Sequence, residues 1–309
     1  MSDTPVSTTS VTDSFALAEE IKTYKTTELI SFLQLQNFEL VEEDLEIIRK
    51  QRVNGRTFFK ITKDELERHG MKLGPATTLV EFAKEYKELK QCIRELKRRL
   101  RNMGSVVADS NEAMRCEYIS VILHASLHIV KRVTKKDLIL EPHFEVIGEE
   151  STSHVDYAIK ALEELICITE GKSYQVNISF AQNLIQCESA LQVNKKKRKT
   201  LEDNFDYIYG IVTTATEWYF ILYTTEKISC TSQESLNIRL VRSALNENSE
   251  AEKELCKNVK RVMEVIVGLL KDRLEVEREP SKKKNGFKGI LKNRRFEIYY
   301  KKFTILRII

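Results

Sequence analysis

The sequence has little glycine, little proline and no long run of apolar residues. It contains 10 Gly and 4 Pro among 309 residues, which argues for regular structure rather than low complexity. No stretch approaches the roughly 20 apolar residues that a membrane-spanning helix needs, so we expect no contact with a membrane. The first residues lack the basic start and apolar stretch of a signal peptide, which predicts a soluble protein of the cytoplasm, the nucleus or both.

The cysteines and histidines do not form metal motifs. The six cysteines are scattered without a Cys-x-x-Cys pair, and several lie in apolar stretches as reduced core thiols do. His124 and His128 stand four apart on a predicted helix but lack a third ligand, so we interpret them as surface histidines. These features indicate a reducing compartment and argue against a disulfide framework.

Length and charge divide the chain into two domains with tails. The length fits two domains, and 42% apolar residues suffice for two cores. Residues 1–19 are rich in Ser and Thr and predict a disordered tail. The net charge of +4 is uneven, because residues 280–309 contain ten Lys or Arg against one Glu. We therefore predict a basic tail over 277–309 that favours phosphates, nuclear import receptors or anionic lipid, and we leave open whether its apolar end forms a strand.

Residues 20–90 predict a bundle of short helices. Thr62 and Glu65 have the spacing of a capping box, and Pro75 suits the first turn of the next helix. Between 53 and 79 the order of motifs is Gly55, Phe58-Phe59, Asp64-Glu65-Leu66, Gly70-Met71 and Gly74-Pro75-Ala76. This order resembles the sterile alpha motif (SAM) family, although the Trp common in that family's first helix is absent. The resemblance implies an all-α five-helix bundle that binds other SAM domains or its own kind; some members also bind RNA.

The helix that follows Pro75 continues past the bundle. Its apolar residues recur at spacings of four and three: Phe82, Tyr86, Leu89, Ile93, Leu96, Leu100 and Met103. This is the 3.5-residue period of a coiled-coil seam. Residues 91–104 therefore predict a helical or coiled-coil linker, which either pairs two chains into a homo-oligomer or folds back on its own domain.

Residues 110–276 predict an α/β sandwich. A helix at 111–133 precedes strands at 143–148, 155–160 and 165–170, and a second helix covers 175–192. A strand pair follows at 207–214 and 218–224, then a further candidate strand at 235–241 and a long helix at 250–275. Helix, three strands, helix, strands and helix is an order that fits a sandwich better than a doubly wound sheet.

Five polar residues in this region follow a recognisable order. They are Glu117 on the first helix, Asp156 at the start of a strand, Glu170 and Lys172 around the end of the next strand, and Gln182 on the following helix, one turn before Gln186. The order resembles the PD-(D/E)XK nuclease superfamily, in particular the nuclease-like domains of fungal and oomycete crinkler-type proteins. The resemblance implies that Asp156 and Glu170 hold Mg²⁺, that Lys172 stabilises phosphate charge and that Gln182 orients groups, with Glu117 in the same cluster.

The chemistry of this set is coherent. Two close carboxylates repel each other and favour a divalent cation between them, and Mg²⁺ binds one or two carboxylates while it keeps several waters. The substrate of a nuclease-like domain with this set would be DNA or RNA. For Asp156 to face Glu170 across an antiparallel strand pair, Ala158 must lie opposite Ile168.

Each of these residues also has a structural interpretation. An Asp at a strand start and a Glu-Gly-Lys segment are common at turns, and Lys195–Lys199 is either a solvated loop or a phosphate-contacting loop. We therefore interpret the chain as a SAM-domain protein that self-associates or recruits partners and carries a nuclease-like domain that binds, and in an active form hydrolyses, nucleic acid with Mg²⁺. The alternative is a non-catalytic interaction scaffold built on an inactive nuclease fold.

Overall fold

The computed structural model describes residues 21–36, 38–147, 152–161, 164–171, 176–197, 207–231, 235–276 and 297–300. The predicted tail at 1–19 and the segment 277–296 of the predicted basic tail lie outside these ranges. The chain divides into two compact units, Met1–Gln91 and Cys92–Ile309, and each is described by itself.

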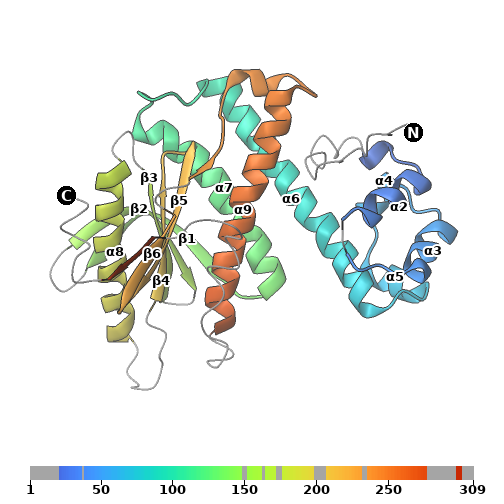
Figure 1. Ribbon diagram of the computed structural model, residues 1–309, viewed down its shortest axis with the longest axis horizontal. Coiled ribbons are helices and arrows are strands. Elements are labelled where there is room, and N and C mark those ends of the chain that lie inside the picture. The colour runs from blue at the N-terminus through green and yellow to red at the C-terminus, as the bar shows by residue number, and fades with distance from the viewer. Residues whose placement is uncertain are drawn as a thin grey trace, which may run out of the picture. The chain divides into compact units, whose positions relative to one another are not determined.

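The first unit consists of helices around one apolar core (Figure 1). The helices are α2 (Thr26–Gln34), α3 (Glu42–Lys50), α4 (Gly55–Phe58), α5 (Lys63–Arg68) and the first part of α6 (Leu73–Met103). The predicted capping box begins α5, since Thr62 Oγ1 accepts from the Glu65 amide at 3.3 Å and Glu65 Oε2 accepts from the Thr62 amide at 2.8 Å. The predicted helical bundle is therefore confirmed.

Aromatic residues close this core. The rings of Phe58 and Phe59 lie 5.5 Å apart edge to face, and those of Phe59 and Tyr86 stack at 5.3 Å. The rings of Phe82 and Phe38 lie 4.8 Å apart, edge to face. The first residues of the predicted coiled-coil seam therefore pack inside the bundle.

The rest of that seam is buried in the second unit. Leu96 and Leu100 are fully buried and Ile93 is 8% exposed, whereas Met103 is exposed. On the same stretch of α6, Lys97 forms an ion pair with Glu252. Of the two alternatives, the structure favours folding back over pairing between chains at Ile93, Leu96 and Leu100, because these side chains are already covered within one chain.

The second unit is a mixed sheet with helices on both faces. Helix α7 (Glu112–Thr134) precedes the antiparallel strands β1 (Leu138–Ile147), β2 (Thr152–Ala161) and β3 (Glu164–Gly171). Helix α8 (Val176–Lys197) crosses over to β4 (Tyr207–Thr213), which runs parallel to β3. Figure 1 shows α8 on one face of the sheet and α7 with α9 (Glu250–Val276) on the other. The predicted α/β architecture is confirmed at this level.

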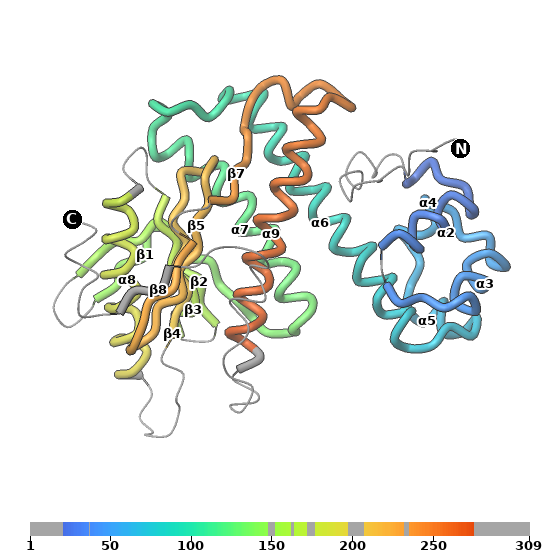
Figure 2. The backbone as a smooth tube through the Cα atoms, in the orientation of Figure 1, coloured from blue at the N-terminus to red at the C-terminus, as the bar shows by residue number. Residues whose placement is uncertain are grey.

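Short strands complete the sheet. Strand β5 (Glu217–Thr224) pairs with β4, β6 (Lys227–Cys230) and β7 (Leu236–Asn237), and β8 (Glu297–Tyr300) pairs with β6. A short 3-10 helix (Arg242–Leu245) leads into α9, a path that Figure 2 traces.

Three boundaries differ from those predicted. Strand β1 begins at Leu138 rather than at 143, and α8 extends to Lys197, so Lys195 and Lys196 end a helix instead of opening a loop. The strand predicted at 235–241 shrinks to β7, while β6 was not predicted. Strand β8 shows that part of the apolar C-terminal segment does form a strand.

Candidate functional site

Asp156 and Glu170 lie on the neighbouring strands β2 and β3. Ala158 is opposite Ile168 and Tyr157 is opposite Thr169, which is the predicted register. The residues are 7% and 3% exposed, respectively. Carboxylates buried this deeply must be hydrogen-bonded or paired.

Glu170 is held from helix α8 by Gln186. The amide nitrogen Nε2 of Gln186 donates to Glu170 Oε2 at 2.9 Å and to the His154 carbonyl at 3.1 Å. Gln186 is 3% exposed, whereas Gln182 is exposed to solvent. The glutamine that meets the carboxylate is therefore Gln186 and not the predicted Gln182. The two lie one helical turn apart, so only the position of α8 along β3 distinguishes them.

Asp156 is held from strand β3 by a backbone amide. Its Oδ2 accepts a hydrogen bond from the Gly171 nitrogen at 2.6 Å. A Cβ placed on Gly171 would lie 3.4 Å from this oxygen and 2.9 Å from Cδ1 of Ile119 on α7. Successive strand residues point to opposite faces, so Gly171 faces α7 where Glu170 faces α8. The hydrogen-bonded oxygens of the two carboxylates thus lie toward different faces, although the register is as predicted.

A distortion of the strands explains this difference. Val155 and Ala158 both belong to the core cluster that contains the buried side chains of α8, although an odd number of steps separates them. The rule that successive side chains of β2 point to opposite faces of the sheet is therefore broken once between Val155 and Ala158, at Asp156 or Tyr157. On the partner strand, His143 lies across from Asp156 in the register of β1 and has a φ of 49°, a left-handed conformation unusual within a strand. Alternation counted from the sequence alone does not predict such a break.

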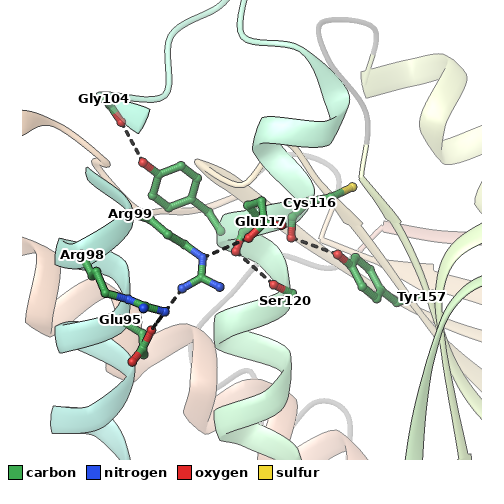
Figure 3. A network of polar contacts seen from close by, with 9 residues as sticks. Glu95, Arg98, Arg99, Gly104, Cys116, Glu117, Ser120 and Tyr157 are labelled. Atoms are coloured by element: carbon green, nitrogen blue, oxygen red, sulfur yellow. Dashed lines mark hydrogen bonds and ion pairs between the residues drawn. The ribbon is translucent and has the colours of Figure 1, made fainter. Parts of the chain in front are cut away.

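A thiol and a phenol stand next to Asp156. The hydroxyl of Tyr157 donates to the Cys116 carbonyl at 2.9 Å, as Figure 3 shows. Burial and, next, the charge of Asp156 raise the pKa of Cys116 to about 11, and burial raises the pKa of Tyr157 as well. Both groups are therefore neutral near pH 7, and Cys116 is not a nucleophilic thiolate there.

Glu117 belongs to a different network. Its Oε2 accepts from Arg99 Nε at 3.3 Å, and Arg99 also contacts Glu95 at 3.2 Å (Figure 3). Its side chain is 56% exposed. Adjacent positions on a helix point about 100° apart, so Cys116 is near Asp156 while Glu117 turns toward α6. The prediction that Glu117 joins the carboxylate cluster is not supported by these contacts.

Two further predicted features can be placed only in part. Lys172 lies outside the described residues, as do Arg198 and Lys199 of the basic run. Within the described ranges, no group of three or more His, Cys, Asp or Glu is arranged to hold a metal ion. Because the hydrogen-bonded oxygens of Asp156 and Glu170 lie toward different faces, the two carboxylates could share only a cation that keeps most of its waters, which is the preference of Mg²⁺.

Sequence reasoning missed one buried polar residue of α7. Arg115 is 2% exposed and donates hydrogen bonds to four backbone carbonyls. Burial lowers the pKa of its guanidinium. A single Arg in an amphipathic helix carries no sequence signal for such a role, because long charged side chains usually reach water.

Together the two units define a protein with a helical bundle of interaction-module type and a mixed α/β domain that contains a buried carboxylate pair. Residues 1–85 match the family model of the SAM-like domain, so the N-terminal unit is a SAM-type domain, as predicted. This match covers just over a quarter of the chain. No curated protein and no solved structure matches the chain. In the described ranges, no helix is long and apolar enough to cross a membrane.

Proposed function

We propose that this protein is an interaction adaptor whose SAM-type domain binds another SAM-type domain, in the first place that of a second copy. The observation that carries this proposal is the SAM-like family match of residues 1–85. The core of the unit is closed, yet two apolar side chains flanking the α2–α3 connection stay in water: Leu35 is 82% and Val41 is 50% exposed. Apolar side chains of this kind form the centre of protein interfaces when a partner covers them.

Leu35→Arg should weaken self-association of the full chain by about tenfold, because a charge would be buried at the contact. Sedimentation velocity between about 5 and 100 µM would resolve such a change for a micromolar dimer. Ile147→Arg is the matched control, since Ile147 is a 62% exposed apolar residue of the second unit. A wild-type chain that remains monomeric throughout, or equal weakening by both variants, would contradict self-association through this connection.

A second function is favoured by the carboxylate pair of the α/β domain. We propose that Asp156 and Glu170 hold a hydrated Mg²⁺, in part through its waters because their hydrogen-bonded oxygens lie toward different faces of the sheet. We also propose that the domain binds nucleic acid, which it cleaves if the site is active. The antiparallel register of β2 and β3 supports this, as does the glutamine that α8 supplies. In addition, Gln186 Oε1 is buried and has no hydrogen-bond partner in the described part of the chain. This oxygen needs a donor, and a water of a hydrated cation is one.

The chain's own residues would share the work at this site. Bound Mg²⁺ would supply charge to polarise a phosphoryl oxygen and to acidify a water. Gln186 orients Glu170 through its Nε2, and the Gly171 amide fixes one oxygen of Asp156. Lys172 keeps its predicted role of stabilising phosphate charge as a proposal.

Asp156→Asn should abolish Mg²⁺-dependent cleavage and leave nucleic-acid binding intact or stronger, because a negative charge near phosphate is removed. Glu170→Gln should also abolish cleavage, and its shape preserves an acceptor for Gln186. The assay uses the full chain with labelled DNA and RNA in Mg²⁺, Mn²⁺ or EDTA. Glu145→Gln, at an exposed position of β1, is the matched control and should change nothing.

The outcome distinguishes this function from the alternative. A wild-type chain that cuts neither polymer but binds one at low salt would leave only the binding role. If it bound neither, the non-catalytic scaffold would be the correct interpretation of the second domain.

A further inference from the structure

A pocket on the SAM-type unit is surrounded by positive charge. Its volume is about 580 Å³. The lining residues are Lys22, Thr23, Tyr24, Lys25, Thr26, Arg52, Asn54 and Arg56. Four of these eight side chains are cationic, and the lining contains no carboxylate. Two chain segments therefore bring four like charges around one hollow, which is unfavourable unless an anion is present.

Most of this charge has no ion-pair partner among the residues that the structure describes. In the described part of the chain, Lys25, Arg52 and Arg56 take part in no ion pair, whereas neighbouring Arg49 is paired with both Glu42 and Glu46. The carboxylate of Glu28 is near Lys25, but its Oε2 accepts from the Lys25 backbone amide at 2.7 Å. The difference from Arg49 indicates that Lys25, Arg52 and Arg56 are available for an external anion.

The backbone holds this arrangement in place. Arg52 has a φ of 49°, a strained left-handed conformation for a residue with a side chain. Its amide donates to the Arg49 carbonyl at 3.0 Å, and the Val53 amide donates to the Ile48 carbonyl at 3.0 Å. Across the pocket, the Gly55 amide donates to the Tyr24 carbonyl at 3.0 Å, which ties the two lining segments together.

We propose that this pocket binds a compact polyphosphorylated group, such as an inositol polyphosphate, either free or as a lipid headgroup. Arg52 and Arg56 offer planar donor pairs that match phosphate oxygens, and Thr23 and Thr26 carry hydroxyl groups at the pocket wall. The volume lies within the range of small-ligand sites, about 300–1,000 Å³. An extended nucleic-acid strand would instead require a groove that continues along the surface. The pocket lining shares no residue with the α2–α3 connection or with the carboxylate pair.

Isothermal titration of the full chain with inositol hexakisphosphate, in about 0.15 M salt to screen diffuse attraction, tests the proposal. The double variant Arg52→Ala/Arg56→Ala should bind about tenfold or more weakly, since two charge-assisted phosphate contacts are lost. The control Lys60→Ala/Lys72→Ala removes the same charge from exposed positions of the same unit and should stay within about twofold. Equal weakening by both double variants would overturn the proposal, because it would indicate net charge alone.

Two further titrations identify the source of the ligand. Vesicles that contain phosphatidylinositol bisphosphate should bind more tightly than phosphatidylserine vesicles of equal charge if the headgroup is lipid-borne, and free hexakisphosphate alone should bind if it is soluble. Binding of either probe supports the proposal if Arg52→Ala/Arg56→Ala abolishes it while the midpoint temperature of thermal unfolding stays that of the wild type. No binding of either probe overturns it, as does a single-stranded RNA that binds this pocket more tightly than hexakisphosphate.

Discussion

Replacing Gly55 by Ala should unfold the SAM-type unit or destabilise it by about 3 kcal/mol or more, at the upper end of overpacking effects. Gly55 is the first residue of α4 and is buried. A Cβ at this position would lie 1.4 Å from the Ile21 carbonyl oxygen and 2.5 Å from its carbon. The obstacle is backbone rather than a flexible side chain, and the hydrogen bond from the Gly55 amide to the Tyr24 carbonyl prevents the two segments from separating without loss.

Hydrogen exchange followed by mass spectrometry measures this effect unit by unit, because the two units need not unfold together. Amides of α2, α3 and α5 should lose protection in Gly55→Ala, and those of β3 and β4 should keep it. Thr78→Ala is the control, since Thr78 is exposed on α6 in the same unit and Ala is favoured over Thr in a helix. Wild-type protection of the first unit in Gly55→Ala would show that the close approach is wrong.

Arg115→Met should destabilise the second unit by about 3 kcal/mol or more, because each buried acceptor left without a donor costs about 1–3 kcal/mol. The guanidinium donates to the carbonyls of Ser110, Val107 and Ala108 at 3.0, 2.9 and 2.9 Å. It also donates to the Thr214 carbonyl in the β4–β5 turn at 2.6 Å. Met fills a similar volume but leaves these backbone carbonyls without a donor. Because they are backbone groups, no second substitution can replace them with apolar atoms.

Chemical denaturation monitored by Trp218 reports on this unit, because the residue is its sole tryptophan and is fully buried. Arg94→Met is the control, since Arg94 is exposed on α6 and makes no ion pair within the described residues. It should change the free energy of unfolding by less than about 0.5 kcal/mol. A similarly small change in Arg115→Met would mean that the four hydrogen bonds contribute nothing net.

Much of the fold could be predicted because the relevant signals are local. The Thr62–Glu65 capping box, the helix start marked by Pro75 and the apolar periodicity of α7 and α9 depend on residues within a few positions of each other. The register of β2 and β3, with Ala158 opposite Ile168, is the one that the sequence analysis required for Asp156 to face Glu170. Strand β6 was missed because its four residues are too short for a periodic pattern.

The candidate site was predicted less completely. Asp156 and Glu170 do lie on neighbouring strands, but Glu117 turns toward Arg99 and Gln186 replaces Gln182 as the partner of Glu170. Residue type and order along the chain do not determine how α7 is rotated about its axis or how far α8 is shifted along the sheet. Those are decided by how the helix packs on the sheet.

The sequence by itself determined the two-part organisation, the SAM-type unit and the mixed α/β class of the second unit, since composition, caps and periodicity are properties of short segments. Only the tertiary structure decided what covers the apolar stripe of α6. The period of Ile93, Leu96 and Leu100 is the same whether a second chain or the rest of this chain buries it. The tertiary structure also decided the break in side-chain alternation near Asp156 and the clustering of Lys22, Lys25, Arg52 and Arg56. Contacts between segments far apart in the sequence depend on packing that no local pattern specifies.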